Sequence, residues 1–138
     1  MLALLLLAAA PASAQDGASI AVLGREPIPV EQSAALSLHG TRITFAYLEN
    51  AGWAREEILP AVAQLARILG QCGVTLTSAE LVRVAAPARF RDFLTPVSRR
   101  LAAALKLSKP TVYFVAGTRQ RPAFDAEAIG RGNSDQLR

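Results

Sequence analysis

The stretch at residues 55–77 constrains the fold more than any other part of the chain. Its apolar side chains recur every three or four residues, which places them on one face of an α-helix. They are Ile58, Val62, Leu65, Ala66 and Leu69. Gly70 and Gly73 favour a helix end, because glycine adopts left-handed backbone angles without a Cβ clash. Val74 and Leu76 then alternate with threonines, as in a strand with one buried face. The stretch therefore predicts a helix that turns sharply into a strand.

Two strands of the expected sheet flank this helix. In residues 41–49, alternate side chains point to opposite sides, with Ile43, Phe45 and Tyr47 together on one of them. The strand after the helix is expected to run over 74–86, with a bend around 78–80 and its valines Val82 and Val84 facing the core. The order strand, helix, strand is typical of an α/β crossover.

A second helix is expected near residue 95. Thr95 is interpreted as its cap and Pro96 as its first helical residue, a favourable pair for a helix start. Its apolar stripe consists of Val97, Leu101, Ala104 and Leu105. Phe90 and Phe93, which precede it, are expected to anchor the connecting segment on the core.

Two further strands complete the prediction. Residues 111–116 are apolar on both faces, which favours a central strand, and 123–129 alternates as an edge strand does. The whole pattern predicts an α/β (α+β) fold with a mixed, mostly four-stranded sheet and two helices. A chain of 138 residues accommodates one such domain, which we place at residues 41–138.

The start of the chain has the features of a secretory signal peptide. An apolar leucine- and alanine-rich run is followed by Pro11 and small residues, so we expect cleavage after Ala14. The run is shorter than the roughly 20 apolar residues that span a bilayer. A buried N-terminal helix is the alternative. We therefore expect a periplasmic or secreted protein with no membrane span after cleavage.

Residues 15–40 are expected to form an N-terminal arm that is only partly ordered. Residues 19–23 could form a short strand. Gly24, Pro27 and Pro29 should then break it, because proline spacing of this kind favours irregular extended chain.

The residues that most often carry catalysis or metals are scarce. His39 is the one histidine and Cys72 the one cysteine. Zinc sites draw three or four protein ligands, so we expect no metal site, and His39 is interpreted as a surface or turn residue. Cys72 is interpreted as a small apolar residue tucked under the turn. A catalytic Cys–His pair is conceivable, but no third orienting group is evident.

The chain carries 15 Lys and Arg against 11 Asp and Glu, a formal charge of +4. Arg89, Arg91, Arg99 and Arg100 cluster in one segment and define a candidate basic face. Nucleic-acid binding needs a reading element as well as charge, and an exported chain rarely meets that partner. The face is interpreted as a solvated surface near anionic envelope components, or as the high arginine content that a GC-rich genome produces.

The run Ile-Thr-Phe-Ala-Tyr-Leu-Glu from Ile43, the helix, and Leu-Gly-Gln-Cys-Gly-Val-Thr-Leu-Thr from Leu69 resemble the opening half of a zincin (metzincin-type) metallopeptidase domain. The resemblance covers about residues 42–130. It implies a strand, a helix and a second strand, followed by further strands, the last an edge strand that lines the substrate cleft. Ala126, Glu127, Ala128 and Ile129 would then pair with substrate backbone.

The defining motif of that family, His-Glu-x-x-His, is not in this sequence. We therefore expect an incomplete zincin-like domain, truncated, degenerate or frame-shifted, with no catalytic residue and no cofactor; zinc is expected only in a full-length relative. In zincins the first helix and the zinc helix cover the same sheet face. Part of that face should therefore be bare here, unless the second helix or a partner fills it.

Two alternatives to this inactive, peptidase-like protein remain. One is a small exported binding module that uses its sheet edge, for a peptide or protein, or its basic face. The other is an enzyme that uses Asp125 and Glu127, although two carboxylates on an edge strand are usually only solvated.

Overall fold

The computed structural model describes residues 19–30 and 39–119. The strands are β1 (Ala21–Ile28), β2 (His39–Leu48), β3 (Val74–Ala85), β4 (Asp92–Phe93), β5 (Thr111–Phe114) and β6 (Gly117–Thr118). The helices are α1 (Arg55–Gln71) and α2 (Thr95–Leu105), with short 3-10 turns η1 (Glu49–Ala51) and η2 (Ala88–Phe90).

The main sheet has the strand order β1-β3-β2-β5. Strands β2, β3 and β5 are parallel to one another, and β1 is antiparallel to β3. A mixed, four-stranded sheet with two helices is therefore confirmed, but its fourth described strand is β1, from the predicted arm, and the predicted strand 123–129 lies outside the described residues. A small parallel pair, β4 with β6, was not expected.

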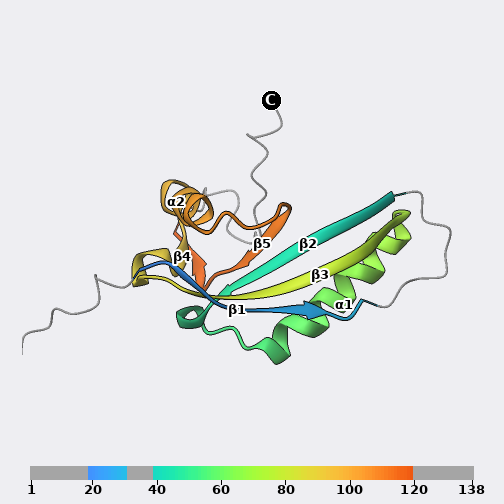
Figure 1. Ribbon diagram of the computed structural model, residues 1–138, viewed down its shortest axis with the longest axis horizontal. Coiled ribbons are helices and arrows are strands. Elements are labelled where there is room, and N and C mark those ends of the chain that lie inside the picture. Colours follow the sequence, from blue (N-terminus) through green and yellow to red (C-terminus); the bar gives the residue numbers. More distant parts are fainter. Residues whose placement is uncertain (1–18, 31–38, 120–138) are drawn as a thin grey trace, which may run out of the picture.

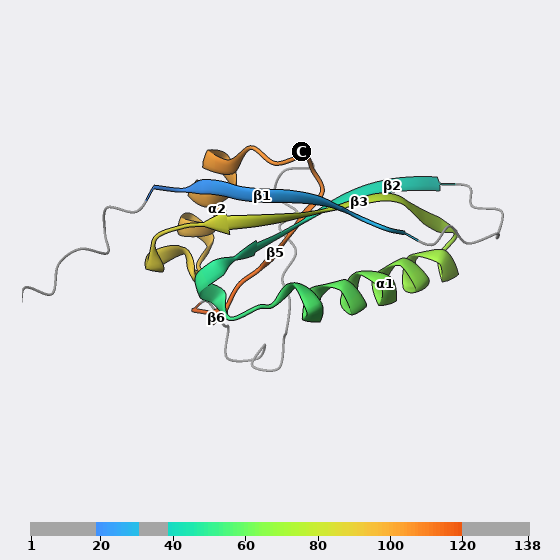
Figure 2. The same ribbon diagram turned by 60° about the horizontal axis from the view of Figure 1, so that its bottom comes forward.

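Helix α1 joins β2 to β3 and lies along one face of the sheet (Figure 2). Its predicted apolar stripe is confirmed, because Ile58 and Val62 are buried against the sheet and the other three members pack around them. The Ala54 N–H donates to the Glu57 carboxylate at 2.8 Å, which satisfies one open donor at the helix start. Gly73, with φ of 71°, provides the left-handed residue that leads into β3.

Helix α2 and η2 lie on the opposite face, over one end of the sheet (Figure 1). Phe90 is 5% exposed and packs in a cluster with Leu48, Ala51 and Leu101, so its predicted role as an anchor is confirmed. Val82 and Val84 are buried beneath Leu107 and Leu105 on this face. Both faces of the sheet thus carry apolar cores, but α2 covers only part of its face.

The predicted break at Gly24, Pro27 and Pro29 is wrong. Strand β1 continues through Pro27 and pairs with β3 from Ala21 to Ile28. A proline is tolerated there because β1 is an edge strand, in which not every N–H has to reach a neighbour. The register shifts between Val22 and Gly24, as a β-bulge does.

The expectation that residues 111–116 form a central strand stays a prediction, because the neighbour expected for it, 123–129, lies outside the described residues. β5 is shorter and pairs on one side, with β2, at an edge of the described sheet. Its side chains are apolar in both directions because Phe114 packs toward the α1 side and Tyr113 toward the α2 side. Apolar contacts on both faces of the sheet therefore accompany the apolar pattern of β5.

Two details of α2 differ from the prediction. The cap residue is Leu94, and Thr95 is already the first helical residue, without a capping side-chain hydrogen bond. Ala104 is exposed rather than part of the buried stripe, whereas Leu101 is buried.

The predicted signal peptide (1–14) and the predicted strand 123–129 lie outside the described residues. Within the described ranges, neither helix is long and apolar enough to cross a bilayer.

Candidate functional site

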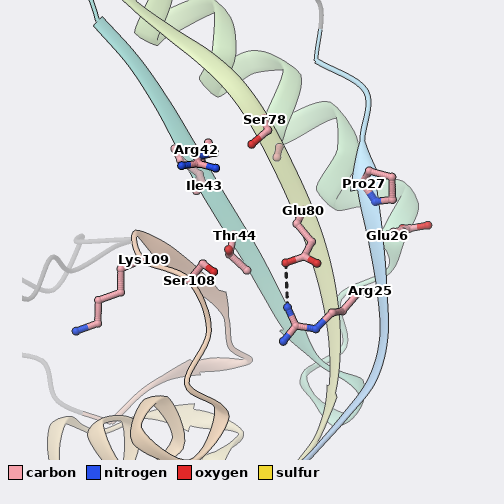
Figure 3. A pocket seen from close by; sticks show the side chains of 11 residues that line it. Arg25, Glu26, Pro27, Arg42, Ile43, Thr44, Ser78, Glu80, Ser108 and Lys109 are labelled. Carbon is pink, nitrogen blue, oxygen red and sulfur yellow. Dashed lines mark hydrogen bonds and ion pairs between the residues drawn. The ribbon is translucent and has the colours of Figure 1, made fainter.

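A hollow lies on the sheet face opposite α1, beyond the end that α2 covers. It has a volume of about 530 Å³ and is open to solvent. We call it the polar basin. Figure 3 shows side chains from β1, β2, β3 and the loop before β5 around it; those that matter below are Arg25, Arg42, Thr44, Ser78, Glu80, Ser108 and Lys109.

The strand alternation places these side chains on one face. Ile43 and Phe45 pack on the α1 side, so Arg42 and Thr44 point to the other side. In the register, Arg42 lies opposite Ser78 and Thr44 opposite Glu80. The floor of the basin is therefore a set of polar residues on adjacent strands, at fixed positions.

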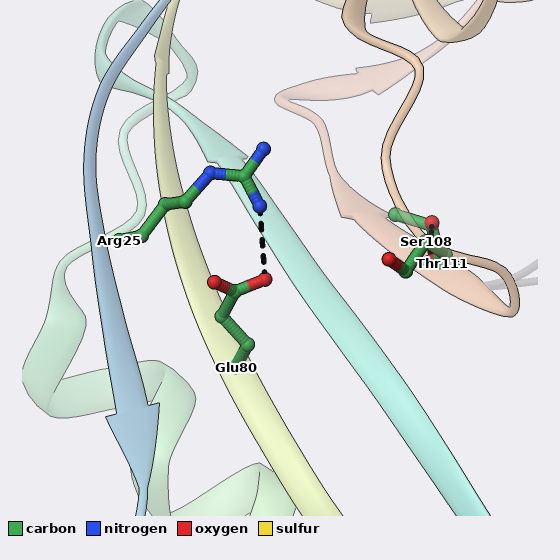
Figure 4. A network of polar contacts seen from close by, with 4 residues as sticks. All are labelled: Arg25, Glu80, Ser108 and Thr111. Carbon is green, nitrogen blue, oxygen red and sulfur yellow. Dashed lines mark hydrogen bonds and ion pairs between the residues drawn. The ribbon is translucent and has the colours of Figure 1, made fainter.

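The loop at residues 108–110 forms one wall of the basin. The Thr44 N–H donates to the Pro110 carbonyl at 3.0 Å, which ties this loop to β2. The Thr111 hydroxyl donates to the Ser108 carbonyl at 2.9 Å (Figure 4). These two bonds hold Ser108 beside the buried Thr44.

The opposite wall is an ion pair. The Arg25 Nη1 atom on β1 lies 3.1 Å from the Glu80 Oε2 atom on β3, with both side chains partly exposed (Figure 4). Arg42 forms no ion pair with a described residue. Lys109 stands at the rim, and its ammonium points away from the ion pair (Figure 3). The basin thus has more positive than negative charge.

A smaller hollow of about 240 Å³ lies near the start of α1, between Tyr47, Arg55 and Arg83. The Arg55 Nε atom lies 2.6 Å from the Glu26 Oε1 atom, and this hydrogen bond raises the pKa of the Arg55 guanidinium. Because Arg55 is already charged at any ordinary pH, the pair has structural rather than acid–base consequences. Elsewhere, burial raises the pKa of the Tyr113 hydroxyl.

No known protein family, curated protein or solved structure matches this chain.

The candidate substrate-edge residues Ala126, Glu127, Ala128 and Ile129 lie outside the described residues, as do Asp125 and the rest of the predicted last strand. Their assignment stays a prediction.

The residues of the candidate basic face lie on two neighbouring elements. Arg89 belongs to η2, Arg91 follows it, and Arg99 and Arg100 are on α2; all four are exposed. The two elements are held together where Phe90 packs with Leu101. The Arg89 guanidinium lies 4.9 Å from the centre of the Phe90 ring, within the range of a cation–π contact. None of the four lines either hollow.

His39 and Cys72 lie at the same end of the sheet, since His39 begins β2 opposite Val74. His39 is exposed, as predicted, but Cys72 is exposed too, so its interpretation as a residue tucked under the turn is wrong. It is the residue after α1, on the outside of the tight turn that Gly73 makes possible. Within the described ranges, no group of three His, Cys, Asp or Glu residues could hold a metal ion.

Sequence reasoning missed the polar basin. Arg42 and Thr44 were seen only as the outward half of an alternating strand, and Arg25 was assigned to an arm. One signal was available in the sequence. On the strand face opposite α1, charged and hydroxyl residues alternate along β2 and β3 with the same spacing as Ala46, Val82 and Val84, which are buried on that face.

Proposed function

We propose that this chain supplies the strand–helix–strand scaffold of a zincin-like metallopeptidase domain and holds no zinc with its own residues. The observation that carries the proposal is the β2–α1–β3 unit, in which the two strands are parallel neighbours and α1 covers one face. The next strand of the main sheet, β5, extends the sheet on the other side of β2. This arrangement agrees with the order of elements that the resemblance implies.

The α1 side of the sheet supplies a second argument. Among the described elements, α2 packs on the other face and so does not cover the surface beside α1. There, Trp53 and Val112 are each 40% exposed. The Trp53 ring packs edge-on against Phe114, with centroids 5.2 Å apart, and its Nε1–H donates to the Val115 carbonyl at 2.9 Å. In the zincin arrangement, the zinc helix would pack on this side of the sheet.

The proposal predicts that this chain has no metal chemistry of its own. We expect the purified mature chain, residues 15–138, to hold well under one equivalent of zinc after dialysis against zinc and then buffer, and to leave peptide substrates uncleaved. Elemental analysis and a fluorogenic peptide assay measure these two quantities. An equivalent of zinc that survives a chelator wash, or zinc-dependent cleavage, would contradict the proposal.

The alternative function, an exported binding module, stays a prediction. Of the four arginines of the basic face, Arg89 belongs to η2, Arg91 follows it, and the other two are on α2. None of them lines the two hollows described above, and the exposed large apolar side chains of the described residues lie on other segments. An exposed basic surface of this kind is usually only solvated, so we do not advance it as a second function.

A further inference from the structure

We propose that the polar basin binds a small organic dianion, a molecule with two anionic groups several ångströms apart. This inference concerns the sheet face opposite α1 and does not depend on the zincin-like scaffold. A hollow of about 530 Å³ falls within the 300–1,000 Å³ that is common for small-molecule sites.

The charges of the basin favour an anion. Arg25, Arg42 and Lys109 line it with one carboxylate on the same face, that of Glu80. The other lining carboxylate, Glu26, is engaged by Arg55. Arg42 is the strongest candidate for a ligand contact, because its guanidinium has no ion-pair partner among the described residues. A guanidinium presents a planar fork of donors that fits carboxylate and phosphate oxygens.

The separation of the two arginines indicates a ligand with two anionic ends. Arg25 and Arg42 lie on strands either side of β3, so their backbones are about two strand spacings, or roughly 10 Å, apart across the sheet. Along β3 they lie opposite Val82 and Ser78, four residues or about 13 Å apart. The Arg25 side chain reaches over β3 toward this gap, whereas the Arg42 guanidinium stands over β2 (Figure 3). A single small anion would contact one guanidinium, whereas an elongated dianion reaches both.

The floor between the two arginines provides neutral polar contacts. The Thr44 side chain lies between them, Ser78 lies beside Arg42 on the neighbouring strand, and Ser108 flanks Thr44 on the wall (Figure 3). Hydroxyl groups can donate to an anion without adding charge. The register of β2 with β3 and the Thr44–Pro110 hydrogen bond fix these groups before any ligand binds, which lowers the ordering cost of binding.

Glu80 gives the proposal an unusual signature. Its carboxylate forms an ion pair with the Arg25 guanidinium, which takes up one of the donors that a ligand could use, and its negative charge repels an incoming anion. Glu80→Gln should therefore tighten binding of a dianion, whereas Arg42→Gln should weaken it. Matched controls are available on α1, across the sheet: Arg67→Gln and Glu56→Gln change the net charge by the same amounts at exposed positions.

The test is calorimetric titration of the mature chain and the four variants with glutarate, succinate and inorganic pyrophosphate at low salt. Circular dichroism first establishes that each variant is folded. The dicarboxylates and pyrophosphate, which carries an anionic group at each end, distinguish a carboxylate ligand from a phosphate ligand. Binding by either class supports the inference, and binding by one identifies the chemistry.

We expect Arg42→Gln to weaken binding about tenfold or more, as loss of a charge-assisted hydrogen bond does. We expect Glu80→Gln to strengthen binding about threefold or more, since it removes a like charge from the site. The two controls should stay within about twofold, because distant exposed charges are screened. Equal effects of Arg42→Gln and Arg67→Gln, weaker binding by Glu80→Gln, or no binding of any probe at millimolar concentration would overturn the proposal.

Discussion

Replacement of Phe90 by alanine is expected to lower the free energy of unfolding by about 3–5 kcal/mol, the usual cost of deleting a buried phenyl ring. Phe90 fills the space between Leu48 at the end of β2, Ala51 and Leu101 of α2, and the ring is 5% exposed. Without it, α2 loses its main contact with the sheet. Because domains of this size are stable by about 5–15 kcal/mol, the variant should be close to unfolding.

Urea unfolding followed by circular dichroism measures this effect. Phe93→Ala is the control, since Phe93 lies three residues away in β4 and is only partly buried. We expect it to cost less than half as much, because a partly exposed ring loses less apolar contact with its neighbours. If Phe90→Ala lowered the urea midpoint of unfolding no more than Phe93→Ala, that result would contradict the described packing of η2 and α2 on the sheet.

The second large effect is expected on the other face of the sheet. Ile58 is fully buried beneath the first turns of α1, in the cluster that includes Phe45, Val62 and Leu81. Ile58→Ala should cost about 2–5 kcal/mol, because it removes buried methyl groups and leaves a cavity under the helix. Ile68, on the same helix, is 46% exposed, and Ile68→Ala should stay within about 0.5 kcal/mol, as exposed substitutions usually do.

The pair Ile58→Ala and Ile68→Ala changes the same atoms in the same helix, so intrinsic helix propensity cancels between them. The difference in their unfolding free energies therefore reports burial alone. Similar losses in the two variants would mean that α1 presents a different face to the sheet from the one described.

The local elements of the fold could be predicted because their signals are local. The stripe from Ile58 to Leu69 fixed the buried face of α1, and the alternation around Phe45 fixed that of β2. Gly73 marked the turn, and the burial of Val82 and Val84 followed from the period-two pattern. In each case a few neighbouring residues carry the whole argument, and the structure confirms it.

Positions that depend on distant segments could not be predicted. Pro27 locally favours irregular chain, but the pairing of β1 with β3 keeps it in a strand. That this strand lies at the edge of the sheet, where a proline is tolerated, follows from the assembled sheet and not from the local sequence. The apolar residues of β5 pack in two directions, Phe114 in the cluster on the α1 side and Tyr113 in the cluster on the α2 side. Cys72 follows the last residue of α1 and is exposed to solvent. Its exposure depends on which residues pack near the turn in the folded chain, and neighbouring residues in the sequence do not show this.

The polar basin shows the same limit for function. Arg25, Arg42 and Ser108 come from three separate parts of the chain, and only the sheet register brings them together. Their residue types are common on exposed strands and loops, so no spacing in the sequence marks them as a group. The candidate residues 126–129, by contrast, came from a resemblance and lie outside the described residues.

The central claim is that the β2–α1–β3 unit belongs to a zincin-like domain. Sequencing the genomic DNA beyond the codon for Arg138 tests it most directly. The claim predicts that a His-Glu-x-x-His motif is encoded there, in one of the three forward frames and within a further domain's length. An uninterrupted coding frame of that length in which none of the three frames encodes the motif would contradict it.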